Sequence, residues 1–108
     1  MERARATRDV IIRPADFDAA VGFYEQVLGL RIFERRPGLV GFETGGFRLF
    51  VERAAPAHGP VFEMLVPDVD EARRELLERG CTVELDEPDF PRLYMRDPYG
   101  LVFNLARR

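Results

Sequence analysis

The sequence has no lysine, one cysteine and one histidine. This composition limits the kinds of partner, disulfide and catalytic site that the chain can have. All 16 basic residues are arginine, and with 19 acidic residues the net charge is −3, which does not suggest a nucleic-acid partner. The single cysteine, Cys81, cannot form a disulfide within the chain, which fits a reducing cytoplasm, and we interpret it as a small core residue. The only histidine, His58, leaves no Ser/His/Asp or Cys/His catalytic set to expect.

Long apolar runs are also missing. No stretch approaches the roughly 20 residues needed to span a membrane. The first residues, Met1 to Arg8, are charged and carry no apolar segment, so we expect no secretory signal and no membrane partner. The chain of 108 residues is 46% hydrophobic, which is enough for one domain with a real core. We therefore predict a single cytoplasmic domain spanning residues 1–108.

What the sequence does contain is an internal repeat. Residues 11–20 read IIRPADFDAA, and residues 63–72, fifty-two positions later, read EMLVPDVDEA. Asp16 thus matches Asp68, and each stretch continues as a helical pattern that ends in glycine. The repeat predicts a first module at about 9–53, a linker at 54–60 and a second module at about 61–108.

Each half predicts a strand, a helix and then three strands. Asp16 and Asp68 are suited to cap helices, and Gly29 and Gly80 to end them in the left-handed conformation. The apolar face of the first helix is expected to contain Ala20, Tyr24, Val27 and Leu28. The strands after the helices are expected at 31–35, 39–44 and 47–53, and at 82–85, 92–96 and 101–106. The order β-α-β-β-β, present twice, predicts an α+β fold in which two modules pair, within one chain or between chains.

Three motifs in this repeat resemble a known family. Phe23-Tyr24 followed by Val27-Leu28-Gly29-Leu30, then the segment 68–72, and then Arg96-Asp97-Pro98-Tyr99-Gly100 are similar to the glyoxalase/bleomycin resistance/dioxygenase (vicinal oxygen chelate) superfamily. The resemblance implies two paired βαβββ modules whose sheets form a cup. It also implies a function among metal-dependent isomerases, lyases and dioxygenases, or among metal-free proteins that sequester antibiotics. Fold alone does not choose between them.

The resemblance also implies four positions for metal ligands. They fall here on Asp9, Val61, Phe50 and Asn104. Val61 and Phe50 have no donor atom, and one carboxylate with one amide does not make the set of about three ligands that a catalytic metal needs. We therefore expect no metal and no other cofactor.

Alternation along the strands separates two faces. One is wholly apolar and is expected to pack against the helices; it contains Val10, Ile12, Leu49, Val51, Phe62, Met64, Phe103 and Leu105. The other mixes charge with apolar and aromatic groups and is the face that the family turns into its cup. On this face we expect ligand-binding residues, namely Arg13, Arg48, Phe50, Glu52, Glu63 and Asn104, with Tyr94 beside them.

The role we expect is that Arg48 and Arg13 orient an anionic or strongly polar group, opposite Glu63 and Glu52. Phe50 and Tyr94 supply flat apolar surface. The competing hypothesis is that these charges only pair with one another and fill a closed cavity.

The family resemblance and the residues of this face leave three functions to consider. The first is a small-molecule-binding protein without the usual metal ligands, sequestering a polar or antibiotic-like compound. The alternative is a lyase, isomerase or dioxygenase with an atypical or metal-free site, with Glu63 or Glu52 as the base. The third is an interaction module. Catalytic residues stay unassigned, and a homodimer is expected because the sheet edges are otherwise open to pairing.

Overall fold

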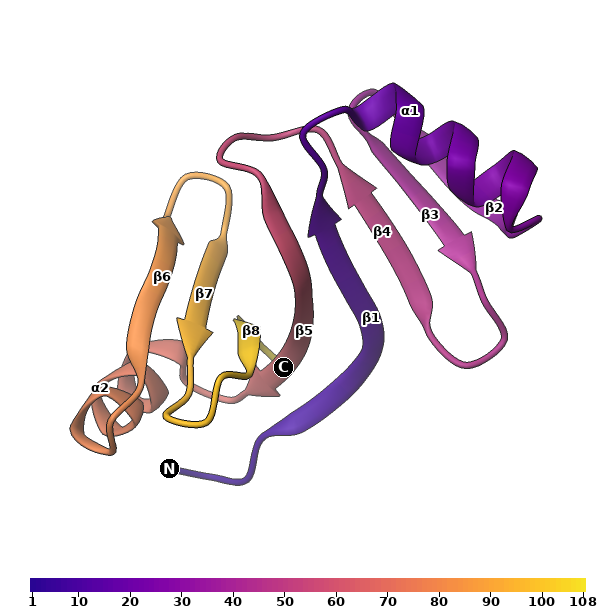
Figure 1. Ribbon diagram of the computed structural model, residues 1–108. Helices are drawn as coiled ribbons and strands as arrows, with labels where there is room; N and C mark the ends of the chain where they lie inside the picture. Colours follow the sequence, from indigo (N-terminus) through magenta and orange to yellow (C-terminus); the bar gives the residue numbers. More distant parts are fainter. The chain divides into compact units, whose positions relative to one another are not determined.

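The computed structural model describes all 108 residues and divides them into two compact units. The N-terminal module is Arg8–Pro60, and the C-terminal module combines Val61–Arg108 with the leading segment Met1–Thr7. Together they contain eight strands and two α-helices (Figure 1). Neither helix is long and apolar enough to cross a membrane.

Two strands contribute to both modules. Strand β1 (Arg5–Arg13) begins in the leading segment that belongs to the C-terminal module, earlier than the sequence pattern indicates. Strand β5 (His58–Val66) begins inside the segment expected as a linker, so His58 lies at a strand start rather than in a loop.

The N-terminal module is a βαβββ unit. After β1 come helix α1 (Phe17–Gly22), a π-helical turn (Phe23–Val27), β2 (Arg31–Arg36), β3 (Leu39–Glu43) and β4 (Arg48–Glu52). The strands lie in the order β2-β3-β4-β1, with β1 parallel to β4 and the other pairs antiparallel. Strand β2 carries a bulge between Ile32 and Glu34.

The C-terminal module repeats this plan. After β5 come helix α2 (Val69–Glu78), β6 (Thr82–Glu87), β7 (Arg92–Arg96) and β8 (Val102–Arg107). The order is β5-β8-β7-β6, again with one parallel pair, and β6 has a bulge at the equivalent place. The α+β class and the two βαβββ modules of the glyoxalase-like fold are thus confirmed.

Local sequence explains where the helices begin and end. The side chain of Asp16 accepts a hydrogen bond from the amide of Ala19, and that of Asp68 from Glu71, each at 3.0 Å. Gly29 and Gly80 have φ angles of +70° and +99°, a conformation that disfavours any side chain. The predicted caps and helix ends are confirmed.

Each module has its own core between the helix and one sheet face. In the N-terminal module the buried members are Val21, Val40, Phe42, Leu49 and Val51. In the C-terminal module they are Val66, Ala72, Cys81, Leu93, Met95, Phe103 and Leu105. The interpretation of Cys81 as a core residue is confirmed.

Two expectations about apolar residues are wrong. Val27 is 70% exposed and Leu28 also faces solvent, because the amide of Leu28 donates to the carbonyl of Phe23, five residues back. This π-helical turn holds more residues than an α-helical turn and rotates both side chains away from the sheet. Phe62 is 43% exposed. Helix α2 is only about 15 Å long, whereas a nine-residue strand such as β5 is about 30 Å long, so α2 cannot cover all of it.

Candidate functional site

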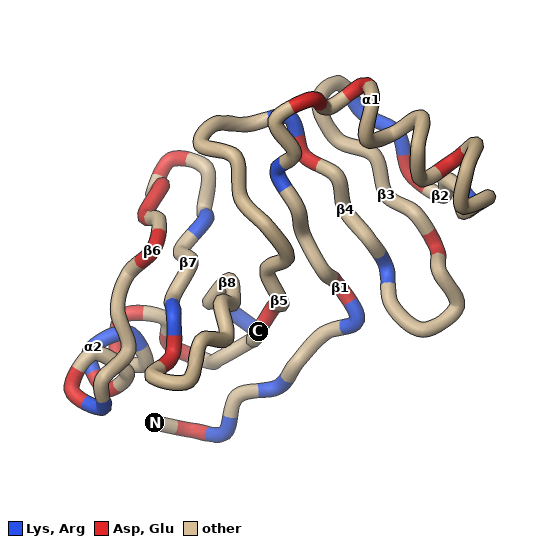
Figure 2. Tube along the Cα trace, in the orientation of Figure 1, with Lys and Arg blue, Asp and Glu red and all other residues tan.

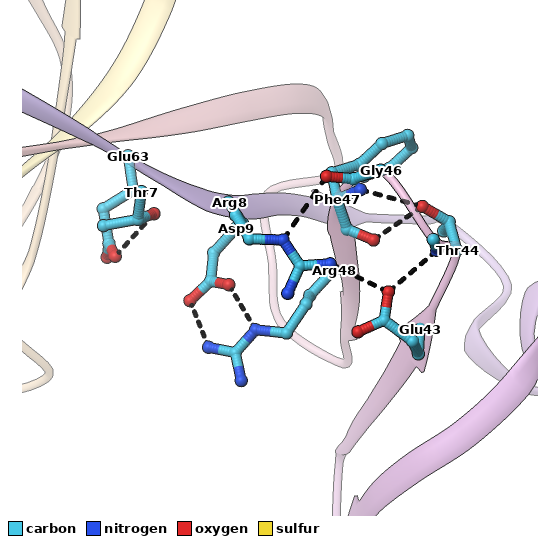
Figure 3. Close-up of polar contacts among 10 residues, drawn as sticks. Thr7, Arg8, Asp9, Glu43, Thr44, Gly46, Phe47, Arg48 and Glu63 are labelled. Atoms are coloured by element: carbon cyan, nitrogen blue, oxygen red, sulfur yellow. Dashed lines mark hydrogen bonds and ion pairs between the residues drawn. The ribbon is translucent and has the colours of Figure 1, made fainter.

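The most distinctive charged group of the N-terminal module is an arginine-carboxylate pair on the face opposite the helix. Asp9 and Arg48 are direct neighbours in the register of β1 and β4. Nε of Arg48 donates to Oδ1 of Asp9 at 2.7 Å, and Nη2 donates to Oδ2 at 3.0 Å (Figure 3). The side chain of Arg48 is 38% exposed and that of Asp9 is 18% exposed. The pair is therefore held rigidly by two bonds while the guanidinium still reaches solvent.

Two aromatic rings flank this guanidinium. Cζ of Arg48 lies 5.1 Å from the ring centre of Phe33 and 5.4 Å from that of Phe50, within cation–π range. The two rings meet edge to face, 5.6 Å apart at 83°. Phe33 is the bulged residue of β2, and a bulge re-aims the side chain it carries.

Gly41 makes room for the rings. A Cβ atom at Gly41 would lie 2.8 Å from Cζ of Phe33 and 3.1 Å from Cε1 of Phe50. Both distances are shorter than ordinary van der Waals contact between carbon atoms. A glycine inside a strand indicates this kind of close approach, and here it lets both rings lie over β3 beside Arg48.

Strands β1 and β4 each carry both acidic and basic residues (Figure 2). The amide of Gly45 donates to the carboxylate of Glu43, and Nη2 of Arg8 contacts it at 2.9 Å; both contacts lower the pKa of Glu43. The hydrogen bonds to Asp9 raise the pKa of Arg48 above its ordinary value, and the charges of Asp9 and Glu43 add to the effect. Like other arginines, Arg48 is a permanent cation.

A second ion pair lies deeper on the same face. Nε of Arg13 donates to Oε1 of Glu52 at 2.9 Å, and the side chains are only 1% and 7% exposed. Buried charges of this kind are costly unless each satisfies the other. Arg13 and Glu52 therefore form a structural pair four residues further along the same two strands.

The C-terminal module carries a polar group of a different kind. Glu63 accepts hydrogen bonds from the hydroxyl of Thr7 at 3.2 Å and from Nδ2 of Asn104 at 3.4 Å. The amide oxygen of Asn104 accepts from the backbone amide of Leu93 at 3.0 Å. Tyr94 is fully buried and lies directly opposite Asn104 in the register of β7 and β8.

The sequence-predicted residues thus fall into three groups. Arg48 and Phe50 lie together, Arg13 pairs with Glu52, and Glu63, Asn104 and Tyr94 belong to the C-terminal module. The structure pairs Arg48 with Asp9, whereas the sequence analysis placed it opposite Glu63.

Sequence reasoning missed Phe33 and Gly41. Their signal was a glycine inside a predicted strand, one strand away from an aromatic residue. That pattern indicates a ring lying against the backbone, which is what Phe33 does at Gly41.

The residues at the four metal-ligand positions do not fit a metal. Both carboxylate oxygens of Asp9 accept from Arg48, and the amide oxygen of Asn104 is used by a backbone amide. Phe50 and Val61 have no donor atom. Elsewhere, no group of three or more His, Cys, Asp and Glu side chains is arranged to hold an ion. No step of a mechanism can be assigned to a metal at these positions.

Comparison with known proteins agrees with this fold. A family model described as Glyoxalase-like domain matches residues 9–106, and the chain belongs to that family. No curated protein is significantly similar to it.

Solved structures with the same fold differ in chemistry. A glyoxalase/bleomycin resistance protein/dioxygenase superfamily member from Vibrio splendidus is 17% identical, covering 95% of this chain and 97% of its own, with a TM-score of 0.60. Methylmalonyl-CoA epimerase from Streptomyces coelicolor is 19% identical, covering 97% and 99%, with a TM-score of 0.55. An extradiol ring-cleaving dioxygenase from B. fuscum is 22% identical, covering 96% of this chain and 32% of its own, with a TM-score of 0.60. At these identities the likeness concerns the fold alone.

Proposed function

We propose that this chain is a metal-independent small-molecule-binding protein. The observation that carries the proposal is the half-exposed guanidinium of Arg48, held by Asp9 and flanked by Phe33 and Phe50. Binding sites combine apolar surface with a few well-placed polar groups, and this cluster does so. The buried Arg13–Glu52 pair fixes the same two strands further along this face, and the protein acts by sequestering its ligand.

The experiment is a thermal-shift screen of carboxylates, phosphates and polar antibiotics, run with and without a strong chelator. We expect at least one compound to raise the melting temperature, because a ligand that binds only the folded state stabilises it. The chelator should leave that shift unchanged. A shift abolished by the chelator, or a screen without any stabilising compound, would contradict the proposal and favour an interaction module.

A second candidate function is metal-free proton abstraction by Glu63. Both oxygens of this partly buried carboxylate are oriented, one by Thr7 and the other by Asn104. A positioned carboxylate can act as a general base. The test is to incubate each stabilising compound with the protein and analyse the products. Turnover that is lost in Glu63→Gln, with binding retained, would replace sequestration by an isomerase or lyase activity.

We further propose that the protein is a cytoplasmic homodimer. The one cysteine is buried as a free thiol in the C-terminal core, which suits a reducing compartment. Sedimentation at micromolar concentration should give about twice the 12.4 kDa of one chain. A species of single-chain mass only would contradict the dimer.

A further inference from the structure

One edge of the Arg48 guanidinium is unused. A guanidinium has five N–H groups, and Asp9 takes the edge formed by Nε and Nη2. Nη1 and the second hydrogen of Nη2 form the tip edge, which makes no hydrogen bond to the protein. Two parallel N–H groups on one edge match the two oxygens of a carboxylate. Since Asp9 fixes the plane of the guanidinium, the tip edge is already oriented.

The surroundings of this edge select the body of a ligand. Phe33 and Phe50 are both partly exposed and stand within 5.4 Å of Cζ of Arg48. Their rings are nearly perpendicular, at 83°, and form a corner beside the guanidinium. Flat apolar groups pack well in such corners, where edge-to-face contact is favourable.

The nearby charges select the charge of a ligand. Asp9, Glu43 and Glu34 are the acidic groups whose charges act on Arg48. Glu43 is partly neutralised by Arg8 and Glu34 by Arg36, but Asp9 remains in direct contact with the guanidinium. The three carboxylates match the three guanidiniums, so the cluster has no excess positive charge to stabilise the second charge of a dianion.

We infer that the tip edge of Arg48 binds a monocarboxylate whose flat, apolar body lies against Phe33 and Phe50. This inference rests on the proposed binding function and names its ligand class. Arg48 then bridges two carboxylates, Asp9 behind it and the ligand in front. Gly41 is the positioning residue, since it lets both rings reach that place.

The probe is benzoate, titrated at pH 7.5 and low salt while amide resonances are followed by NMR. We expect saturable shifts at Arg48 and its neighbours. Benzamide lacks the charge and acetate lacks the ring, so each should bind at least tenfold more weakly. Phenyl phosphate is largely a dianion at this pH and should also bind more weakly. Equal binding of benzamide, or tighter binding of phenyl phosphate, would overturn the inference.

The chain offers a matched control for the arginine. Arg53 also contacts a carboxylate, Asp18 at 3.1 Å, and lies 4.6 Å from the ring centre of Phe17. Arg48→Met should weaken benzoate binding roughly tenfold to a hundredfold, the range for hydrogen bonds between charged groups. Arg53→Met should leave it within about twofold, since sites without ligand contact act independently. Equal losses in the two variants would overturn the inference.

Two further results separate this inference from the proposed function. If Arg48→Met fails to fold, Arg48→Lys is the second variant, because it keeps the charge but loses the forked edge. Arg48→Lys should bind benzoate about tenfold more weakly than the unchanged protein does. Undiminished binding would overturn the inference. If benzoate does not bind but another compound stabilises the protein, the ligand class is wrong and the binding function stands. If nothing binds, both fail.

Discussion

The two modules share one backbone plan but differ in what they place on the face away from the helix. In the N-terminal module that face carries Asp9, Arg48 and the rings of Phe33 and Phe50, partly open to solvent. At the equivalent repeat positions the C-terminal module has Val61, Val102, Glu84 and Asn104, and three of these four residues are buried. The same fold thus supports a charged, accessible surface in one copy and a packed surface in the other.

The clearest single difference is at β3 and β7. Gly41 lies opposite Phe50 in the first module, and Tyr94 lies opposite Asn104 in the second. Gly41 has no side chain, and the ring of Phe33 occupies the space beside it. At the equivalent position, the side chain of Tyr94 is present and completely buried. A glycine-to-tyrosine difference therefore separates an open ring site from a closed one.

The largest effect should come from the ion pair of Arg13 and Glu52, because both charges are buried. The second module has Leu65 and Ala106 at the equivalent positions. Arg13→Leu leaves the carboxylate of Glu52 buried without this partner and should lower the free energy of unfolding by about 3 to 5 kcal/mol. The double variant Arg13→Leu/Glu52→Ala copies the second module and should recover most of that loss. Urea denaturation measures both, and a double variant as unstable as the single one would contradict the account.

A smaller effect is expected at Gly41. Gly41→Ala forces the ring of Phe33 to move, which should cost about 1 to 2 kcal/mol of stability and weaken benzoate binding severalfold. Gly46→Ala is the control, because a Cβ there has open space. Calorimetry and the NMR titration give the two quantities. Unchanged ring resonances of Phe33 in Gly41→Ala would contradict the close approach of this ring to Gly41.

The helix caps test where the modules are alike. Asp16→Ala and Asp68→Ala each remove a 3.0 Å side-chain bond to a free amide at a helix start. Each should lower the free energy of unfolding by about 1 kcal/mol. Chemical denaturation of the two variants side by side checks the equality. A difference well above the experimental error would mean that one helix contributes more to folding than the common plan implies.

The smallest effect concerns Cys81, whose repeat counterpart is Leu30. Burial raises the pKa of this thiol above its ordinary value of 9.0. The unfolded chain loses the proton first as pH rises, so stability should begin to fall only above pH 9. Cys81→Ala should remove this loss. Alkylation of the native protein at pH 8 should be very slow, and fast labelling under native conditions would contradict a core position.

Much of the fold could be predicted because its determinants are local. Asp16 and Asp68 act on amides three residues away, and Gly29 and Gly80 act on their own backbone, so a linear pattern contains them. The two sheet faces followed from alternation. The exposure of Val27 did not, because the π-helical turn changes the residue count per turn without an evident sequence mark.

The site was harder to predict because it depends on register between distant strands. Asp9 and Arg48 meet only because β1 pairs in parallel with β4 at that alignment. Alternation assigns both to one face but does not say which residue lies beside which. For that reason Arg48 was expected opposite Glu63, and the contribution of Phe33 was not seen.

The pair formed by Asp9 and Arg48 determines where the positive charge of this face comes from. A positive charge supplied by a bound metal ion has to be acquired and can be removed by a competing chelator. Here the positive charge is encoded in the chain as a guanidinium, which stays protonated in proteins, and Asp9 fixes its orientation. It is present as soon as the chain folds, and starvation for metals leaves it intact. The charge cannot, however, be restored from solution once it is lost, since one codon change at position 48 removes it permanently.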